Sequence, residues 1–386
     1  MIIRDFTDND LYKFSVMNAI QKKFPDAEVV YRFVNRGETA FPEGFGEALR
    51  REVDAMRTLF LTDTAEQFMR RRCYYFDNVF FDLLKGFRFN PAEVSVVQDG
   101  GRLEVEVRGL WYRTVLWEVP LMAMISELYY RMTGATPAAD AEDRAREKAR
   151  RFVEINAELS EFGTRRRFSF DIQDRVIGIL KECMPRVLNG TSNVYMAMRH
   201  DLIPMGTHPH EWFMYHGAHY GYRVANEQAM ENWVDVYDGY LGIALTDTFT
   251  TADFFKSFST KYAKLFDGLR CDSGDPFDFT ERALRYYQMH RIDAKKKTVV
   301  YSDSLDLETI ARIKSHVAGR LHDVYGVGTF LTNDVGVKPL NIVIKLFEVK
   351  PKGETDFLPV VKLSDSPGKY TGDPDEIDLC KRLLKF

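Results

Sequence analysis

Cysteine is rare in this sequence of 386 residues, which contains only four. They stand at positions 73, 183, 271 and 380, far apart and without a C-x-x-C pair. This spacing argues against a zinc ribbon, a dithiol redox motif and a secreted disulfide scaffold. Isolated cysteines suit a reducing compartment, so we expect a cytoplasmic protein.

Long apolar runs are absent as well. The longest, at residues 115–130, is interrupted by two glutamates and a proline and falls short of the ~20 apolar residues that span a bilayer. Arg4, Asp5 and Asp8 lie where the apolar core of a signal peptide would begin. We therefore expect neither a membrane segment nor export.

An excess of basic charge is missing too. Lys and Arg number 53 against 57 Asp and Glu, which gives a net charge of −4. Such a chain has no general attraction to nucleic acid or anionic lipid, so an anionic substrate must be held by local groups of Arg and Lys. What the chain does have is apolar material. Its 45% hydrophobic and 13% aromatic residues are enough for one large core or two ordinary ones.

The first part of the chain has mixed signals. Residues 94–98 and 102–107 alternate apolar and polar side chains around Asp99-Gly100-Gly101, which predicts an antiparallel hairpin with one buried face. Residues 45–59 repeat apolar positions at helical spacing. The Ala-, Glu- and Arg-rich residues 138–151 are typical of a solvated helix or connector. We therefore expect an α+β domain here.

After Glu161 apolar strands that end in small or acidic residues alternate with amphipathic helices. The strand–helix pairs are 241–247 with 252–266, 268–273 with 278–290, 298–304 with 307–317, and 324–329 with 331–334. Parallel barrels and doubly wound sheets have this pattern, and their sites lie at the carboxyl ends of the strands. Polar residues that follow these strands should therefore converge.

These patterns together predict an α/β protein with two domains. An α+β N-terminal domain would contain residues 1–125 and would be completed by about residues 345–386. A further strand is expected at residues 340–349, across the start of this last part. An irregular, TIM-like α/β barrel would contain residues 126–344.

Histidine is clustered in the middle of the chain. Five of the eight histidines lie between positions 200 and 219, and the densest segment is GTHPHEW at residues 206–212. His208 and His210 form an H-x-H pair that could bind a metal together with His216 and His219. Pro209 between them and the position in mid-chain argue against this, and the plainer interpretation for His208, His216 and His219 is that they are satisfied by hydrogen bonds in the core or are simply exposed.

Eleven short segments carry a resemblance to a known family. They are DNDLYK (8–13), LWEVP (116–120), EFGTRRRFS (161–169), GTSN (190–193), GTHPHEW (206–212), LTD (245–247), RCDSGDP (270–276), SDSLD (302–306), GVGT (326–329), VKPLNIVIKL (337–346) and LSDSPGK (363–369). In order and spacing they resemble the bacterial nicotinate phosphoribosyltransferases. One such segment alone is a weak signal, but the ordered set covers nearly the whole chain.

The resemblance implies a reaction and a histidine for it. Nicotinate and 5-phosphoribosyl-1-diphosphate would give nicotinate mononucleotide and diphosphate for NAD biosynthesis, coupled to hydrolysis of ATP through a phosphohistidine. His210 occupies the place of the phosphorylated histidine, and imidazole is a good nucleophile near neutral pH. Asp247 is the acid that we expect to orient it, although a carboxylate there could also cap the next helix. The enzyme would be an ATP-dependent, ligase-class phosphoribosyl transferase.

The resemblance also implies a nicotinate pocket. Phe162 and Tyr12 would stack on the ring, while Arg270 and Thr207 would bind the carboxylate. In this family the tyrosine of the D-x-Y-K segment reaches the site of a neighbouring subunit. We therefore expect a homodimer with shared active sites.

Phosphoribosyl diphosphate needs donors for a 5-phosphate and a diphosphate. The resemblance supplies eight residues for this substrate: Arg165, Arg167, Asp272, Ser302, Asp303, Gly326, Gly328 and Thr329. Magnesium should enter bound to the substrate's diphosphate, and we assign it no definite protein ligand.

Three other hypotheses remain open. A nicotinamide phosphoribosyltransferase would share the architecture and differ in substrate. A metal-dependent barrel hydrolase would use His208, His210 and an aspartate as ligands. A binding module that merely keeps the fold would lack chemistry, but every site position named above has a chemically competent residue.

Overall fold

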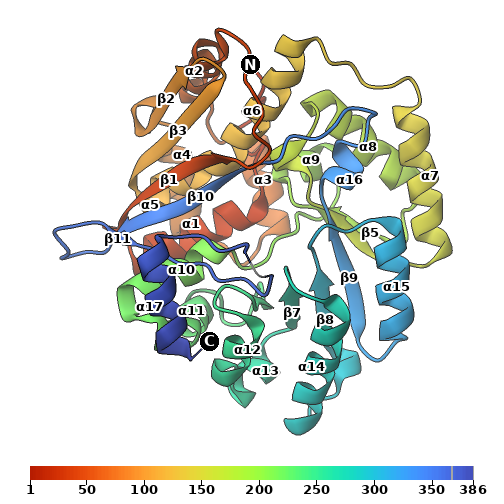
Figure 1. The fold of residues 1–386 in the computed structure, drawn as a ribbon. Helices are drawn as coiled ribbons and strands as arrows, with labels where there is room; N and C mark the ends of the chain where they lie inside the picture. The colour runs from red at the N-terminus through yellow and green to blue at the C-terminus, as the bar shows by residue number, and fades with distance from the viewer. Residues whose placement is uncertain (367, 386) are drawn as a thin grey trace. The chain divides into compact units, whose positions relative to one another are not determined.

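A computed structural model describes residues 1–366 and 368–385 and divides into two compact units. The first unit consists of Met1–Asn18, Val30–Met205 and Val327–Lys345. The second consists of Ala19–Val29, Gly206–Gly326 and Leu346–Phe386. Figure 1 shows the ribbon with its element labels.

A sheet of the first unit contains the predicted hairpin. Its strand order is β10-β1-β3-β2. Only parts of β1 (Glu28–Asn35) and β10 (Ile342–Lys350) belong to this unit. β2 (Val94–Asp99) and β3 (Arg102–Leu110) pair in the register Val94↔Val107 to Asp99↔Arg102. Gly100 closes the turn at φ 54°, a left-handed conformation that glycine adopts without strain. The predicted hairpin is confirmed.

Helices make up most of the rest of the first unit, with a short parallel pair of strands. The helices are α2 (Phe45–Ala55), α3 (Asp63–Arg72), α4 (Asn78–Gly86), α5 (Trp111–Thr114), α6 (Glu118–Thr133), α7 (Ala141–Glu154), α8 (Phe170–Cys183), α9 (Val194–Arg199) and α16 (Thr329–Thr332), and α1 (Leu11–Lys23) begins here. β4 (Leu159–Glu161) and β5 (Leu188–Thr191) run parallel. Fully buried rings such as Trp111 and Trp117 form the core.

The second unit contains four parallel strands in the order β9-β8-β7-β6. They are β6 (Ile243–Leu245), β7 (Gly268–Cys271), β8 (Thr298–Tyr301) and β9 (His322–Val327). The helices are α10 (His210–Tyr220), α11 (Tyr222–Tyr237), α12 (Thr251–Ser257), α13 (Thr260–Leu265), α14 (Pro276–Met289), α15 (Leu307–Val317) and α17 (Pro374–Leu384), while β11 (Leu358–Pro359) pairs with the end of β10.

The strands and helices of the second unit follow from local signals. Leu269 and Val299 are completely buried, as expected for central strands of a covered parallel sheet. Asp306 caps α15 by accepting from Thr309 N at 2.8 Å, and Asp275 caps α14 by accepting from Phe277 N at 2.7 Å. These caps start the helices directly after the strand ends.

The predicted fold class is confirmed: the chain is α/β, with a parallel sheet and a separate N-terminal α+β part. One predicted element was wrong in detail. Residues 252–266 form two helices, because the backbone is extended at Ser259, which stands as the cap residue of α13. Within the described residues no helix combines the length and apolarity that a bilayer crossing requires. The predicted domain boundaries stay a prediction.

Candidate active site

His210 is the first residue of α10 and makes four contacts through its two ring nitrogens. Nδ1 lies 3.0 Å from Thr248 Oγ1, in the loop after β6. Nε2 lies 3.0 Å from Asp272 Oδ2, 2.8 Å from Lys362 Nζ and 3.8 Å from Asp247 Oδ1. Pro209 precedes the helix in an extended conformation and sets where it starts.

The protonation of His210 follows from these contacts. Burial and the Lys362 ammonium lower the pKa of His210, and together they outweigh the two aspartates that favour its charged form. The ring is therefore neutral near pH 7. The contact of Nε2 with the Asp272 carboxylate needs a proton on Nε2 and belongs to a ring that is protonated there. An ammonium can only donate, so the contact with Lys362 belongs to the neutral tautomer in which Nε2 accepts and Nδ1 donates to Thr248 Oγ1. This tautomer leaves the nucleophilic lone pair on Nε2.

Arg270, in β7, ties several predicted residues into one network. Its Nη1 donates to Thr207 Oγ1 at 2.8 Å, its Nε to Ser302 Oγ at 2.9 Å and its Nη2 to Asp272 Oδ1 at 2.6 Å. Burial opposes ionisation of Asp272, but Arg270 and His210 outweigh burial and hold the pKa of this carboxyl well below its usual range. Asp272 is thus an anion between a guanidinium and the imidazole.

Asp247 follows β6 and is completely buried. Its Oδ2 accepts from Ser273 Oγ at 2.6 Å, whereas Oδ1 has no hydrogen-bond partner among the described residues. The next helix, α12, is capped by Thr250 and not by Asp247. Asp247 is therefore not the cap of this helix, which was the other role considered for it. Ligand atoms of His210, Asp247 and Asp272 lie within 4.8 Å of one another, close enough for a cation.

A C-terminal segment, residues 362–366, lies against this cluster. Leu363 N donates to Thr248 O at 2.8 Å, Asp365 N to Ser273 Oγ at 3.0 Å, and Asp365 Oδ1 accepts from Thr251 N at 2.8 Å. These bonds fix Lys362 beside His210. Sequence reasoning missed Lys362, and the only available signal was its position next to the LSDSPGK segment, of which Pro367 lies outside the described residues.

Two further predicted residues of the second unit lie at strand ends without joining the Arg270 network. Asp303 follows β8, and its Oδ2 lies 3.4 Å from Lys369 Nζ. Gly326 is buried near the end of β9. Asp275, in the same RCDSGDP segment as Asp272, is used as the cap of α14.

The first unit contains the rest of the predicted residues. Phe162 N donates to Val327 O at 2.8 Å, and a side chain at Gly328 would come within 3.3 Å of Phe162 O. Thr329 starts α16 directly after this glycine. The structure thus brings Phe162, Gly328 and Thr329 together, and a side chain at position 328 would crowd the Phe162 carbonyl group.

The arginine run 165–167 splits three ways. Arg167 is completely buried and makes a bidentate pair with Asp8 at 2.8 and 2.9 Å, so its donors serve the interior of the unit. Arg165 is exposed and lies 3.4 Å from Glu118. Burial and the nearby charges of Arg165 and Arg36 lower the pKa of Arg166. The Arg166 guanidinium has no partner within the described part of the chain and is the better candidate for an anion.

Tyr12 and Glu161 complete the picture of the first unit. Tyr12 lies in the first turn of α1, with its ring centroid 5.1 Å from the Lys13 ammonium. Glu161 accepts from Thr191 Oγ1 and Gly163 N at 2.5 Å each, and from Gln173 Nε2 at 3.2 Å. Burial raises the pKa of Glu161 to about 7. This carboxyl links the segment of Phe162 to that of Thr191.

Among the described residues, no second histidine joins His210 in a group that could hold a metal. His208 is completely buried, and its ring lies 4.5 Å from the ring of Trp233. His216 lies 2.7 Å from Trp212 O through Nδ1 and 3.0 Å from Asn232 Nδ2 through Nε2, which satisfies both nitrogens. Burial lowers the pKa of both histidines to about 3. They are neutral core residues, as the plainer interpretation predicted.

Comparison with known proteins decides the family. Residues 7–126 match the N-terminal domain of the nicotinate phosphoribosyltransferase (NAPRTase) family, and residues 157–386 match the nicotinate phosphoribosyltransferase family itself. The chain belongs to the nicotinate phosphoribosyltransferase family. This confirms the resemblance carried by the eleven segments.

Relatives of the nicotinate phosphoribosyltransferase family match along the whole chain. The nicotinate phosphoribosyltransferase of Chromohalobacter salexigens is 52% identical, over 98% of this chain and 97% of the relative. The crystal structure of nicotinate phosphoribosyltransferase from Porphyromonas gingivalis matches with a TM-score of 0.97 and 48% identity, over 100% of both chains. That from Vibrio cholerae matches with a TM-score of 0.93 and 35% identity, over 100% of this chain and 95% of the other.

Proposed function

We propose that this protein transfers the phosphoribosyl group of 5-phosphoribosyl-1-diphosphate to nicotinate and couples the transfer to ATP through a phosphohistidine at His210. The bond from the anomeric carbon to the diphosphate oxygen breaks, and a bond from that carbon to the nicotinate ring nitrogen forms. Diphosphate leaves with the electron pair. The observation that carries the proposal is the neutral His210, with its Nε2 lone pair held by Lys362.

The phosphorylation step uses that lone pair. Nε2 would attack the γ-phosphorus of ATP, the bond to the β-phosphate oxygen would break, and ADP would leave. The proton stays on Nδ1, where Thr248 Oγ1 lies 3.0 Å away and fixes the ring. Lys362 would turn from the lone pair to the new phosphoryl oxygens, because an ammonium binds an anion better than an imidazole nitrogen. Hydrolysis would later release phosphate and restore the contact between Lys362 and His210.

Nicotinate recognition would depend on Arg270 and Thr207. The guanidinium already donates to Thr207 Oγ1 and Asp272 Oδ1, so its orientation is fixed before substrate binds. A nicotinate carboxylate can replace or share one of these acceptors, whereas the uncharged amide of nicotinamide gains less from a guanidinium. We further propose that Phe162 and Tyr12 stack on the ring.

Phosphoribosyl diphosphate would bind through Ser302, Asp303, Gly326, Gly328 and Thr329, with Arg165 and Arg166 for its diphosphate. Magnesium would neutralise the leaving diphosphate when bound with it. Carboxylate oxygens are suitable magnesium ligands, and the buried Oδ1 of Asp247 accepts no hydrogen bond from the residues described. Asp247 and Asp272 are thus the residues that would hold the ion from the protein side.

Release of diphosphate tests the reaction. The purified protein is mixed with magnesium and phosphoribosyl diphosphate, with nicotinate or nicotinamide, with and without ATP. We expect turnover with nicotinate and an increase with ATP. Turnover with nicotinamide alone would keep the transfer chemistry and overturn the substrate, and no turnover with either would overturn the proposed function.

We also propose a homodimer in which Tyr12 of one protomer serves the site of the other. Two variants that should lack ATP-stimulated transfer test this, Tyr12→Ala and His210→Asn. Mixed dimers of the two variants contain one site with both residues intact, so mixing under exchange conditions should restore activity. If mixing restores nothing while mixed dimers form, Tyr12 acts within its own protomer.

A further inference from the structure

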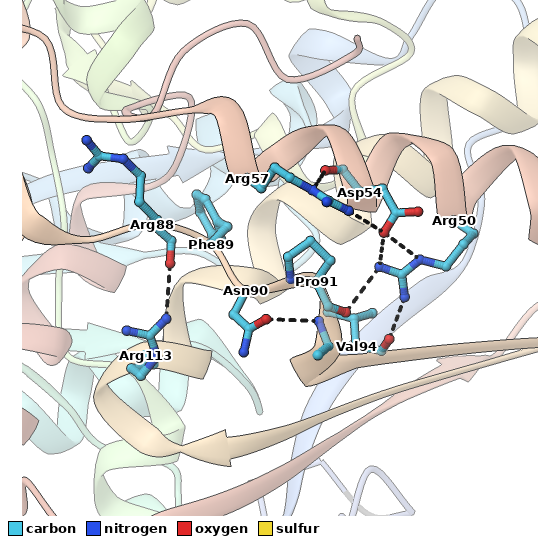
Figure 2. A pocket seen from close by; sticks show the side chains of 10 residues that line it. Arg50, Asp54, Arg57, Arg88, Phe89, Asn90, Pro91, Val94 and Arg113 are labelled. Atoms are coloured by element: carbon cyan, nitrogen blue, oxygen red, sulfur yellow. Dashed lines mark hydrogen bonds and ion pairs between the residues drawn. The ribbon is translucent and has the colours of Figure 1, made fainter.

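A second group of arginines surrounds a cavity that is built only from residues of the first unit. The cavity has a volume of about 690 Å³. Figure 2 shows the side chains around it. Its charged and aromatic walls are Arg50, Asp54, Arg57, Arg88, Phe89 and Arg113. None of these residues belongs to the segments that carry the family resemblance or to the network of His210.

Backbone carbonyl groups accept hydrogen bonds from all four of these arginines. Arg50 donates to Val94 O at 2.6 Å and to Pro91 O at 3.1 Å, and Arg113 donates to Arg88 O at 3.0 Å. Figure 2 shows these bonds around the segment that contains Asn90 and Pro91. Carbonyl acceptors orient a guanidinium without cancelling its charge. The charges are therefore positioned before any ligand arrives, which reduces the entropy that binding costs.

The positive charge at the cavity is not balanced. Arg50 and Arg57 share one carboxylate, that of Asp54, at 2.9 and 3.4 Å. Glu93 pairs with Arg113 at 2.9 Å and also accepts from Trp117 Nε1 at 3.0 Å. Four guanidinium groups thus face two carboxylates, in a chain whose total charge is −4. A local excess of positive charge on an acidic protein indicates a site for an anion.

Unused donors remain at the rim. Arg88 donates through Nη1 to Lys85 O and Phe87 O, which leaves its Nε and Nη2 without a partner in the described part of the chain. Arg57 uses Nε and Nη2 and leaves Nη1. Both side chains are exposed. Their planar, multiple donors suit phosphate oxygens better than a single point charge would.

One wall of the cavity is a packed aromatic ring. Phe89 is buried, and its ring lies 4.7 Å from Trp117 and 5.3 Å from Phe87. At the edge, the guanidinium of Arg88 lies 5.2 Å from the ring of Phe60, which is 49% exposed. An exposed ring beside a cation offers a place for a flat group as well as for charge.

We propose that this cavity is a second anion site, which binds the oligophosphate chain of a small molecule, either inorganic or attached to a nucleoside. Several fixed guanidinium groups along the walls fit a chain of phosphates, and a volume of about 690 Å³ lies in the range that holds such molecules. None of its lining residues is among those that the proposed reaction uses.

Calorimetric titration of the full chain with inorganic tripolyphosphate, at low salt, tests the proposal. The test variant is Arg57→Gln/Arg88→Gln, which removes the two residues with unused donors. The matched control is Arg51→Gln/Arg71→Gln, which removes the same charge from two exposed arginines that do not line the cavity. Arg88→Gln alone is a milder variant, and the melting temperature of each variant reports its folding.

We expect the test variant to lose one class of tripolyphosphate sites, or to bind there about tenfold more weakly or worse, with diphosphate release from substrates unchanged. The control should bind as the wild type does. Equal binding by wild type and test variant, or an equal loss in the control, would overturn the proposal. Comparison with ATP at the same class of sites then identifies the source: equal affinity indicates the phosphate chain alone, and tighter ATP binding indicates a nucleotide.

Discussion

Lys362 Nζ lies 2.8 Å from His210 Nε2, although 152 residues separate the two in the sequence. The lysine thereby selects the tautomer of the histidine and keeps the pKa of His210 low, in addition to burial. The same ammonium lies 3.6 Å from Asp247 Oδ2. Lys362 is thus positioned to bind the neutral imidazole of His210 before phosphorylation and the phosphoryl oxygens afterwards, and it stays beside Asp247 in both cases.

Lys362→Met should raise the pKa of His210, because the variant removes a cation beside the imidazole while Asp247 and Asp272 remain. ATP should then stimulate transfer much less, by about tenfold or more, since a phosphoryl group on His210 would lose a charged partner. Titration of the His210 ring by NMR and the ratio of rates with and without ATP measure the two effects.

Lys352→Met is the matched control, because Lys352 is 81% exposed and pairs with Asp26 in the same unit. It should leave both readouts at the wild-type value. If Lys362→Met kept normal ATP stimulation, Lys362 would be a structural partner of His210 only.

His210→Asn should abolish ATP coupling and leave slow, ATP-independent transfer. The asparagine amide can take the place of Nδ1 in the bond to Thr248, so the loop after β6 should keep its structure, but it cannot accept a phosphoryl group. Labelled ATP and acid-labile phosphate on the protein measure the step directly. Stimulation by ATP equal to that of the wild type would remove His210 from the coupling role.

Local patterns in the sequence predict the strands and helices that position the site. Helix α15 spans the predicted residues 307–317, because its amphipathic repeat begins at the capping Asp306. Asp247, Asp272 and Ser302 were expected together because each follows a parallel strand, and the structure places them around His210 and Arg270. Alternation, spacing and capping are local, so a single sequence displays them.

Contacts made by irregular segments have no such signal. The segment of Lys362 has no repeat, and bonds such as that from Leu363 N to Thr248 O define its path. The run of Arg165, Arg166 and Arg167 falls in a tight turn, which points successive side chains in different directions. Burial of Arg167 against Asp8 depends on packing over 159 residues of sequence separation and could not be read from the run itself.

Arg270→Ala should raise the KM for nicotinate far more than the KM for ATP. The truncation removes the donor to Thr207 and also the main counter-charge of Asp272. Arg270→Lys separates these effects: it keeps a positive charge near Asp272 but cannot make three bonds in the plane of a guanidinium. Steady-state kinetics should show the nicotinate defect in both variants. Equal effects on the two KM values would place Arg270 outside the nicotinate pocket.

Glu161→Gln should flatten the dependence of stability on pH. Burial raises the pKa of Glu161 to about 7, so the folded chain keeps this proton in a range where the unfolded chain has lost it. Between about pH 4.5 and 7 the folded state therefore binds more protons, and the free energy of unfolding falls as pH rises, by on the order of 3 kcal/mol in total. Above that window the contribution is constant.

Glutamine does not titrate, and it can still accept from Gly163 N and donate to Thr191 Oγ1. The test is urea unfolding at several pH values from 5 to 8, for the wild type, Glu161→Gln and the half-exposed control Glu142→Gln. The slope of the unfolding free energy against pH is compared, so a constant difference in stability between the variants has no effect on the result. A slope in Glu161→Gln as steep as in the wild type would mean that Glu161 is ionised throughout this range and that its bonds to Thr191 and Gly163 outweigh burial.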